Sequence, residues 1–299
     1  MKIVNIIGGL GNQMFQFAFA LALKERWPSE EVMIDTSHFK HIFIKKWGAS
    51  NLHNGYEIDK VFPKAKLPIA SAKQIRKVSR YVPNYVLSRV ARKLLPPRDS
   101  EIIQTLKDYF AFDEKVLARE GDCYYEGIWE AVSFIHSARN RIVDAYAHPE
   151  AVEKNAQIIA QMESEESVGI HVRRGDYIYL PSFMGICDID YYKNAIERIL
   201  EDGRKHIFYI FSNDMGWCEE NIKPLVGDNQ MVMVTHNTGI NSCWDMHLMT
   251  HCKDLIIANS SFSWWGAFLN GRGGRVIAPS KWVNREAEFD VWLPEWIRV

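Results

Sequence analysis

The sequence predicts an α/β protein with two domains, each built around a mostly parallel β-sheet. Two observations support this. A strand, a glycine turn and an amphipathic helix open the chain, and beyond residue 166 short apolar runs alternate with helical patterns. The acidic residues 163–166 separate the two patterns, and 299 residues suffice for two ordinary domains. We therefore expect Rossmann-like domains at residues 1–163 and 164–299, with the ligand site in the cleft between them.

The first domain begins with an apolar strand at residues 2–7, which ends at glycines. Apolar side chains then recur at the spacing of one helix face, at Met14, Phe17, Ala18, Leu21 and Ala22. Residues 36–98 suggest only helical pieces rich in Lys and Arg, with a stop at Pro96-Pro97. The pattern predicts further strands at residues 32–34 and 124–129, and helices at residues 131–147 and 149–162.

The second domain shows a regular alternation of strand and helix. Strands are predicted at residues 167–172, 207–211, 231–234, 255–258 and 275–278, and helices at residues 191–200, 215–222, 241–251 and 263–270. This order is typical of a doubly wound parallel sheet. Such sheets bind ligands outside the carboxyl ends of their strands, so the loops that follow strands are the first places to look for function.

Charge and cysteine content exclude several classes of protein. A net charge of −1 rules out a broad basic face for nucleic acid and gives no general attraction to anionic membranes. Five cysteines, an odd number without CxxC spacing, indicate reduced thiols rather than a disulfide framework or a zinc ribbon. No apolar run approaches about 18 residues, and the start of the chain does not fit a signal peptide. We expect a soluble cytoplasmic protein.

The first candidate loop is Gly8-Gly9-Leu10-Gly11-Asn12-Gln13. Glycines let backbone amides approach a ligand, and the helix that follows offers its positive end. The loop is a poor dinucleotide fingerprint, because Met14 stands where the third glycine belongs. The amides of Asn12 and Gln13 suit sugar hydroxyls. A tight turn that binds nothing is the alternative.

The second candidate loop is the most informative. A buried strand delivers His171, Arg173, Arg174 and Asp176 within six residues, with Gly175 among them. Burying so many polar groups without partners would cost several kcal/mol, at roughly 1–3 kcal/mol for each group. An anionic ligand would supply partners, and the planar fork of arginine matches a phosphate. The alternative is an internal Arg–Asp ion pair, and both can hold at once.

The third candidate loop joins a strand that ends at Asn259 to a helix that begins among Ser260, Ser261 and Ser263. Backbone amides and hydroxyls at a helix start form a cradle for phosphate. N-capping alone would explain one serine but not three. The adjacent Trp264 and Trp265 are expected in the core.

Weaker signals have simpler explanations. Asn213 and Asp214 end another strand and suit ribose or base contacts, although Asp214 could instead cap the next helix. Asp188 and Asp190 resemble the DxD motif of metal-dependent glycosyltransferases, but they precede a helix and are expected to cap it. A further cluster, Cys243, His247, His251 and Cys252, could bind zinc but is better explained as a helix packed on the sheet.

Together the motifs resemble a known family. The matching segments are, in order, Gly8–Gln16, His171–Tyr177, Phe211–Asp214, Trp244–Met246 and Ile257–Trp265. The chain resembles the α-1,2-fucosyltransferases, as a bacterial member of glycosyltransferase family 11, over about residues 3–280. Residues 36–160 carry no motif of the family, and we expect acceptor choice to reside there.

The resemblance implies a two-domain glycosyltransferase of the B type with GDP-β-L-fucose as donor. Transfer with inversion to O2 of a terminal β-galactose would give a Fucα1-2Gal linkage, in surface polysaccharide or lipopolysaccharide synthesis, without a metal or other cofactor. The implied donor contacts are Gly11, Asn12, Arg173, Arg174, Asn213, Asp214, Asn259, Ser260, Ser261 and Phe262. Asn12 and Gln13 would contact the acceptor.

Three residues are the candidates for catalysis. Arg173 would hold the departing diphosphate, where negative charge grows in the transition state. A base should help to deprotonate the galactose hydroxyl, and Asp176 is the first candidate, with His171 in reserve.

Rival functions remain. Another fucosyl linkage (α-1,6, or transfer to a protein hydroxyl) is the nearest, followed by a glycan-binding protein without activity and an NAD-dependent enzyme. The basic residues Lys73, Arg76, Lys77, Arg80, Arg89, Arg92 and Lys93 could give loose contact with a membrane surface, although a solvated basic face explains them equally simply. The sequence predicts no oligomeric state.

Overall fold

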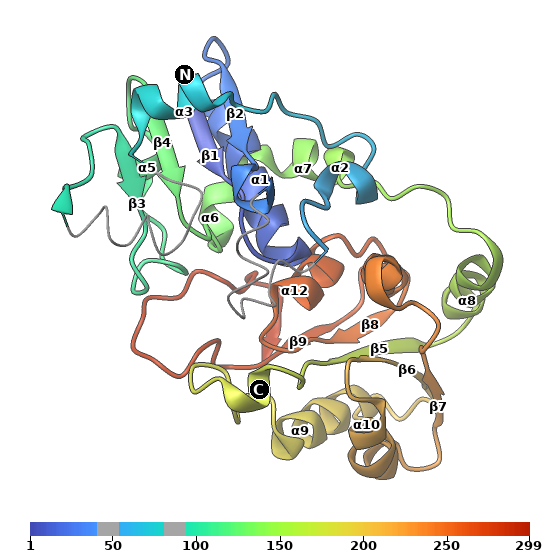
Figure 1. The fold of residues 1–299 in the computed structure, drawn as a ribbon. Coiled ribbons are helices and arrows are strands. Elements are labelled where there is room, and N and C mark those ends of the chain that lie inside the picture. Colours follow the sequence, from blue (N-terminus) through green and yellow to red (C-terminus); the bar gives the residue numbers. More distant parts are fainter. Residues whose placement is uncertain (41–53, 81–93) are drawn as a thin grey trace. The chain divides into compact units, whose positions relative to one another are not determined.

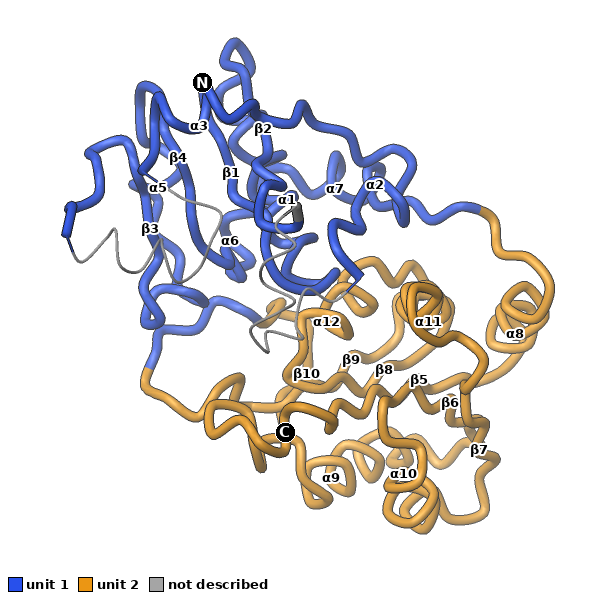
Figure 2. Tube along the Cα trace, viewed as in Figure 1, with its two compact units in different colours: residues 1–149, 287–291 blue, residues 150–286, 292–299 orange. Residues whose placement is uncertain are grey.

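The computed structural model describes residues 1–40, 54–80 and 94–299. The chain divides into two compact units, shown in different colours in Figure 2: unit 1 comprises residues 1–149 and 287–291, and unit 2 comprises residues 150–286 and 292–299. Each unit has its own parallel β-sheet with helices packed against it (Figure 1). The predicted α/β class with two Rossmann-like domains is confirmed.

The division between the units falls at residues 149 and 150 rather than at 163 and 164. Helix α8 (Glu153–Ser164) belongs to unit 2, where the Asn155 side chain bonds to His236 at 2.8 Å and to Asn237 at 3.0 Å. The short segment 287–291 returns to unit 1, because the Asp290 amide donates to the Phe110 carbonyl at 2.8 Å. These contacts join residues far apart in the sequence, so no local pattern predicts them.

In the residues that the structure describes, the sheet of unit 1 has four parallel strands: β1 (Lys2–Asn5), β2 (Val32–Asp35), β3 (Glu101–Ile103) and β4 (Cys123–Glu126). Their order is β2-β1-β4-β3. Strand β1 pairs with β2 on one side and with β4 on the other, so the carboxyl end of β1 lies beside that of β4. The glycine loop leaves β1 at this point.

The helices in the described residues of unit 1 are short apart from the first. Helix α1 (Leu10–Arg26) is buried along most of its length, and Phe19 within it stacks on Trp129 with ring centroids 4.4 Å apart. The predicted helix at residues 131–147 is divided into three pieces, α6 (Val132–Ile135), η3 (His136–Ala138) and α7 (Arg139–Ala145). The other helices described in unit 1 are η1 (Ser37–Lys40), α2 (Ile58–Val61), α3 (Ala72–Val78) and α5 (Glu114–Leu117).

The basic segment lies on unit 1 in part. On and beside α3, the exposed cations are Lys73, Arg76, Lys77 and Arg80. Lys77 pairs with Asp122 at 2.7 Å, whereas Ile75 and Val78 turn toward the core. The other three cations, Arg89, Arg92 and Lys93, lie outside the described residues. Membrane contact by this segment stays a prediction. Among the described helices, none is both long and apolar enough to cross a membrane.

The sheet of unit 2 contains six parallel strands: β5 (Ser167–Val172), β6 (Ile207–Ser212), β7 (Gln230–Met233), β8 (Asp254–Ile256), β9 (Val276–Ala278) and β10 (Ile297–Arg298). Their order is β10-β9-β8-β5-β6-β7. The chain runs outward from β5 to β7, returns to pair β8 with the other side of β5, and continues outward to β10. The switch point of this sheet therefore lies between β5 and β8.

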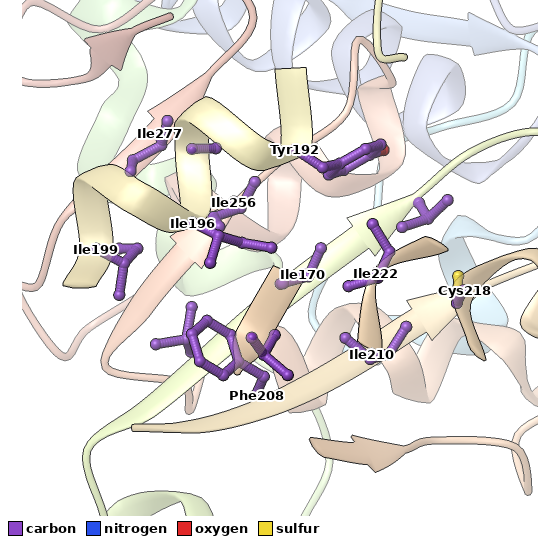
Figure 3. Packing of buried hydrophobic residues seen from close by; sticks show 14 of the residues in the cluster. Ile170, Tyr192, Ile196, Ile199, Phe208, Ile210, Cys218, Ile222, Ile256 and Ile277 are labelled. Atoms are coloured by element: carbon purple, nitrogen blue, oxygen red, sulfur yellow. The ribbon is translucent and has the colours of Figure 1, made fainter. Parts of the chain in front are cut away.

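Helices α9 (Ile189–Leu200) and α10 (Met215–Asn221) help to form the core of unit 2. Figure 3 shows Ile196 and Ile199 of α9 facing Ile170 of β5 and Phe208 of β6, all at most 1% exposed. Helices α11 (Cys243–Met249) and α12 (Ser261–Phe268) follow β7 and β8, and short turns are η4 (Tyr177–Tyr179), η5 (Lys223–Val226) and η6 (Gly239–Ser242). Trp264 and Trp265 are completely buried, as expected for core residues.

Candidate active site

The switch point of unit 2 brings together the second and third candidate loops. Strands β5 and β8 are neighbours, with Ile170 opposite Ile256, so the chain segments that leave them start side by side. The ring of His171 in the first segment lies 5.6 Å from the ring of Phe262 in the second, measured between centroids. Ligands of open α/β sheets bind at such a point. Residues 171–176 and 259–263 thus form one candidate site.

His171 is a buried polar group at this site. Its side chain is only 7% exposed, and its Nδ1 has no hydrogen-bond partner among the residues that the structure describes. Burial and, to a smaller extent, the nearby charge of Arg173 together lower the pKa of the imidazole to about 3. A ring that stays neutral at pH 7 is a weak proton acceptor, so His171 is suited to hydrogen bonding with a ligand rather than to general-base work.

Arg174 is tied into the fold. Its Nε donates to Asp214 Oδ2 at 3.0 Å, and its guanidinium carbon lies 4.3 Å from the centroid of the Trp217 ring. Its backbone amide donates to Asn213 Oδ1 at 3.0 Å. A Cβ at Gly175 would lie 2.1 Å from Asn213 Nδ2, so the absence of a side chain there permits this approach. These contacts join the loop after β5 to the loop after β6.

The two residues after β6 therefore have roles within the fold. Asp214 is the N-cap of α10, because its Oδ1 accepts a hydrogen bond from the Trp217 amide at 3.2 Å. Its other carboxylate oxygen holds Arg174. Asn213 holds the backbone of the loop after β5. Nucleoside contacts by Asn213 and Asp214 stay a prediction, and the structure shows both as braces between two loops.

Arg173 has a different environment. Its Nη2 pairs with Asp176 Oδ1 at 2.6 Å, and its guanidinium carbon lies 5.2 Å from the centroid of the Tyr177 ring. Both side chains of the ion pair are partly exposed, at 31% for Arg173 and 49% for Asp176. Nε and Nη1 of Arg173 make no hydrogen bond to any residue in the described part of the chain. The guanidinium therefore retains donors for an anionic ligand.

The start of α12 lies across the switch point. Asn259 is 2% exposed, and its side chain is held by the Trp282 carbonyl at 3.1 Å and by Cys187 Sγ at 3.4 Å. Ser260 is the N-cap residue, yet its hydroxyl makes no capping hydrogen bond within the described chain. The Ser263 hydroxyl turns back to the carbonyls of Ala258 and Ser260. The helix thus presents its positive end with no side-chain cap from Ser260.

The glycine loop of unit 1 uses Gln13 as an internal brace. The Gln13 side chain is completely buried, and its Nε2 donates to the carbonyls of Gly8 at 2.9 Å and Gly55 at 2.8 Å. Its Oε1 accepts from the Glu57 amide at 2.9 Å. A buried amide needs such partners. This differs from the acceptor contact expected for Gln13, whose side chain points into the fold rather than toward a ligand.

Asn12 is the amide that stays near the surface of this loop. It is half-buried and lies over Gly8, where a Cβ would come within 3.1 Å of Asn12 Nδ2. The φ angle of Gly8 is +81°, a conformation that favours glycine. Gly11 is buried in the first turn of α1. The structure therefore keeps Asn12, and not Gln13, as the candidate contact for sugar hydroxyls.

Two glutamines that were given no role from the sequence, Gln16 and Gln104, join the loops at the carboxyl ends of the unit 1 strands. Gln16 is completely buried and joins the Ile7 amide at 2.8 Å to the Gly127 carbonyl at 3.1 Å, which ties the loop after β1 to the loop after β4. Gln104 Oε1 accepts from the amides of Ile128 and Trp129, each at 2.9 Å. The sequence signal that could have pointed to Gln16 is a polar amide side chain inside an otherwise apolar helix.

Asp245 of α11 also lay in a motif without an assigned role. Burial raises the pKa of its carboxyl group to about 7, although a hydrogen bond from Asn237 at 2.9 Å opposes the shift. Asn237 follows β7 and also bonds to Asn155 of α8. Unit 2 therefore contains, in α11, a carboxyl group that changes charge near neutral pH.

In the two sequence patterns that could have bound a metal, the DxD motif and the Cys/His cluster, individual residues make structural contacts. Asp188 caps α9 by accepting from the Tyr191 amide at 3.0 Å, as expected. His251 pairs with Glu163 at 2.7 Å. Among the described residues, no three His, Cys, Asp or Glu side chains are grouped as metal ligands. All five cysteines lie in the described residues, and none forms a disulfide.

Comparison with known proteins places the chain among glycosyltransferases. It is 29% identical to the O-antigen biosynthesis glycosyltransferase WbnK of Escherichia coli, over 98% of both chains. It is 28% identical to an α-1,2-colitosyltransferase of E. coli, over 99% of this chain and 98% of the relative. The galactoside α-(1,2)-fucosyltransferase 2 of Mus musculus is 27% identical over 56% of this chain and 52% of its own.

The fold has a counterpart among solved structures. The crystal structure of the α-1,6-fucosyltransferase NodZ soaked with GDP-fucose matches 95% of this chain and 96% of its own, with a TM-score of 0.52 and 13% identity. At that identity the likeness shows the fold alone, which agrees with two Rossmann-like units of the glycosyltransferase B type. The family model for glycosyl transferase family 11 matches residues 1–299. The chain therefore belongs to glycosyltransferase family 11.

Proposed function

We propose that this protein transfers L-fucose from GDP-β-L-fucose to O2 of a terminal β-galactose, with inversion, during the synthesis of a bacterial surface polysaccharide. The observation that carries the proposal is the pairing of two anion-binding features at one switch point: Arg173 after β5 and the start of α12 after β8. The names of the O-antigen and α-(1,2)-fucosyltransferase relatives support the pathway class and the linkage.

The proposed chemistry follows from where charge develops. As the bond from the anomeric carbon to the diphosphate breaks, negative charge grows on the departing oxygen. Arg173 and the amides at the start of α12 are fixed donors for that charge, which is the most effective form of catalysis by a preformed site. His171 adds a neutral hydrogen-bonding group beside them. These donors can act without a metal ion, and metal independence is part of the proposal.

Asp176 stays the proposed base, and in the structure its carboxylate is paired with Arg173. The guanidinium of Arg173 engages one carboxylate oxygen of Asp176, Oδ1, and holds the carboxylate in place. A diphosphate that binds Arg173 would compete for the guanidinium and release Asp176. Binding of the donor would thus prepare the base. Asn12 is proposed to contact sugar hydroxyls, and Gln13 to support the loop that carries Asn12.

A colitosyl donor is a second candidate, because one relative that aligns over nearly the whole chain is an α-1,2-colitosyltransferase. Colitose is fucose without the 3-hydroxyl group. A site built to bond that hydroxyl would reject the deoxy sugar strongly, whereas an apolar site would discriminate by only about 10- to 200-fold. Competition between the two GDP-sugars for one acceptor therefore separates the candidates.

The test is a transfer assay with GDP-fucose and a panel of β-galactosides in excess EDTA, with the linkage read by NMR. An α-1,2-linked fucoside formed in EDTA would support donor, linkage and metal independence together. An α-1,6-linked product or an O-fucosylated protein would refute the proposed linkage. Failure to bind GDP would refute the diphosphate site itself, and a product formed only with the GDP-colitose donor would favour the second candidate.

A further inference from the structure

Two stacked aromatic rings, those of Tyr177 and Phe183, lie next to the guanidinium of Arg173. The Tyr177 ring, whose centroid is 5.2 Å from the guanidinium carbon, stacks on the Phe183 ring with centroids 4.6 Å apart and planes inclined by 19°. Tyr177 opens the short turn η4 directly after the loop of the site. Arg173 is thus held by two side chains, the ring of Tyr177 and the carboxylate of Asp176.

The loop that carries Phe183 is fixed by Asn284. The Asn284 backbone amide donates to the Ser182 carbonyl at 2.7 Å. Its side-chain Nδ2 donates to the carbonyls of Pro181 at 3.1 Å and Met184 at 2.7 Å. These bonds hold the chain on both sides of Phe183. Two residues earlier, the Trp282 carbonyl accepts from Asn259, so the segment 282–284 braces both halves of the candidate site.

The two contacts of Arg173, with Asp176 and with the Tyr177 ring, differ in which guanidinium N–H groups they leave available to a ligand. Asp176 occupies an N–H group at the edge of the guanidinium and competes with any phosphate for it. A ring attracts the cation through its face and uses none of the N–H groups at the edge. Those groups form the fork that binds phosphate. Holding the guanidinium in advance also reduces the side-chain freedom lost on binding.

We propose that Tyr177 is a positioning residue for Arg173. Its ring directs the guanidinium toward the diphosphate, and Asn284 fixes the ring through Phe183. This inference rests on the proposed role of Arg173 in binding the donor. It assigns a function to an aromatic side chain and to a distant loop, neither of which belongs to the set of proposed donor contacts.

The test measures GDP affinity by calorimetry in full-length variants. Tyr177→Leu removes the ring, and we expect GDP to bind about 3- to 30-fold more weakly, as for loss of a cation–π contact. Tyr177→Phe keeps the ring and should remain within about twofold of the wild-type affinity. Tyr179→Leu is the matched control, because Tyr179 lies in the same turn and is 80% exposed. Melting temperatures establish that each variant is folded.

The decisive comparison repeats Tyr177→Leu in an Arg173→Ala background. If the ring acts through Arg173, its loss costs nothing further there, whereas independent effects would multiply. Equal losses in both backgrounds, normal affinity of Tyr177→Leu, or weakening by Tyr179→Leu to the same degree would each overturn the inference. Unchanged GDP affinity of Arg173→Ala would instead overturn the proposed function on which it rests.

Discussion

Replacing Arg173 by alanine should abolish most of the transfer activity while leaving the fold intact. The guanidinium is a fixed donor at the place where we expect charge to grow on the diphosphate, and removing one such donor typically lowers kcat about 100- to 1000-fold, equivalent to roughly 2.7–4 kcal/mol. Within the described part of the chain, the ion pair lost is the one with Asp176, and both partners are partly exposed. Pairs of this kind contribute about 0–1 kcal/mol to stability.

The protein contains a close match for this ion pair away from the candidate site. Arg198 and Glu201 of α9 and its C-cap also stand three residues apart and also pair at 2.6 Å. Arg198→Ala should therefore show the same small change in the free energy of unfolding with unchanged kcat. The assay compares single-turnover rates and urea unfolding for both variants. Turnover of Arg173→Ala near the wild-type rate, in a folded protein, would refute the assignment.

Three further predictions concern the supports of the two units. Gln13→Leu leaves two carbonyls and one amide without their partner. At roughly 1–3 kcal/mol for each group, urea unfolding should show a loss of about 3–9 kcal/mol, whereas the exposed Gln161→Leu should change stability by under about 0.5 kcal/mol; equal effects would contradict the brace. Gly175→Ala forces Asn213 away from the Arg174 amide and should weaken GDP binding, whereas Gly216→Ala, with open space around it, should not. Asp245, whose pKa burial raises to about 7, binds its proton more tightly in the folded state. Its contribution is therefore greatest below about pH 4, the ordinary range of an aspartate, and is lost as the pH rises to 7. Urea unfolding of Asp245→Asn should show no such loss between pH 4 and 7, and parallel curves for the two proteins would refute the shift.

The strands of unit 2 were predictable because their pattern is strong. β5 is buried on both faces and occupies the predicted residues 167–172. By contrast, β3 and β10 have only three and two residues, which is too short for any periodicity to show. The predicted helix at residues 131–147 is divided into three short pieces, each of which buries apolar side chains.

The sequence predicted which loops form the candidate site, but not which residues in them bind a ligand and which support the fold. Its motifs place His171, Arg173 and Ser260 in loops that follow strands. The structure shows that these loops leave neighbouring strands, so their carboxyl ends meet at one edge of the sheet. Arg174, rather than Arg173, is tied into the fold because it contacts Asp214 and Trp217, which lie about forty residues away along the chain. Gln13 likewise finds its partners at Gly55 and Glu57. Such pairings depend on tertiary packing, which cannot be predicted from the spacing of motifs along the sequence.

Amide hydrogen exchange with and without GDP tests the central claim most directly, because it locates the diphosphate on the sheet. We predict that GDP protects the loop at residues 173–177 and the start of α12, which leave neighbouring strands at the switch point of unit 2. Protection that is absent, or confined to the glycine loop at residues 8–13 as a dinucleotide-binding enzyme would show, would contradict the account.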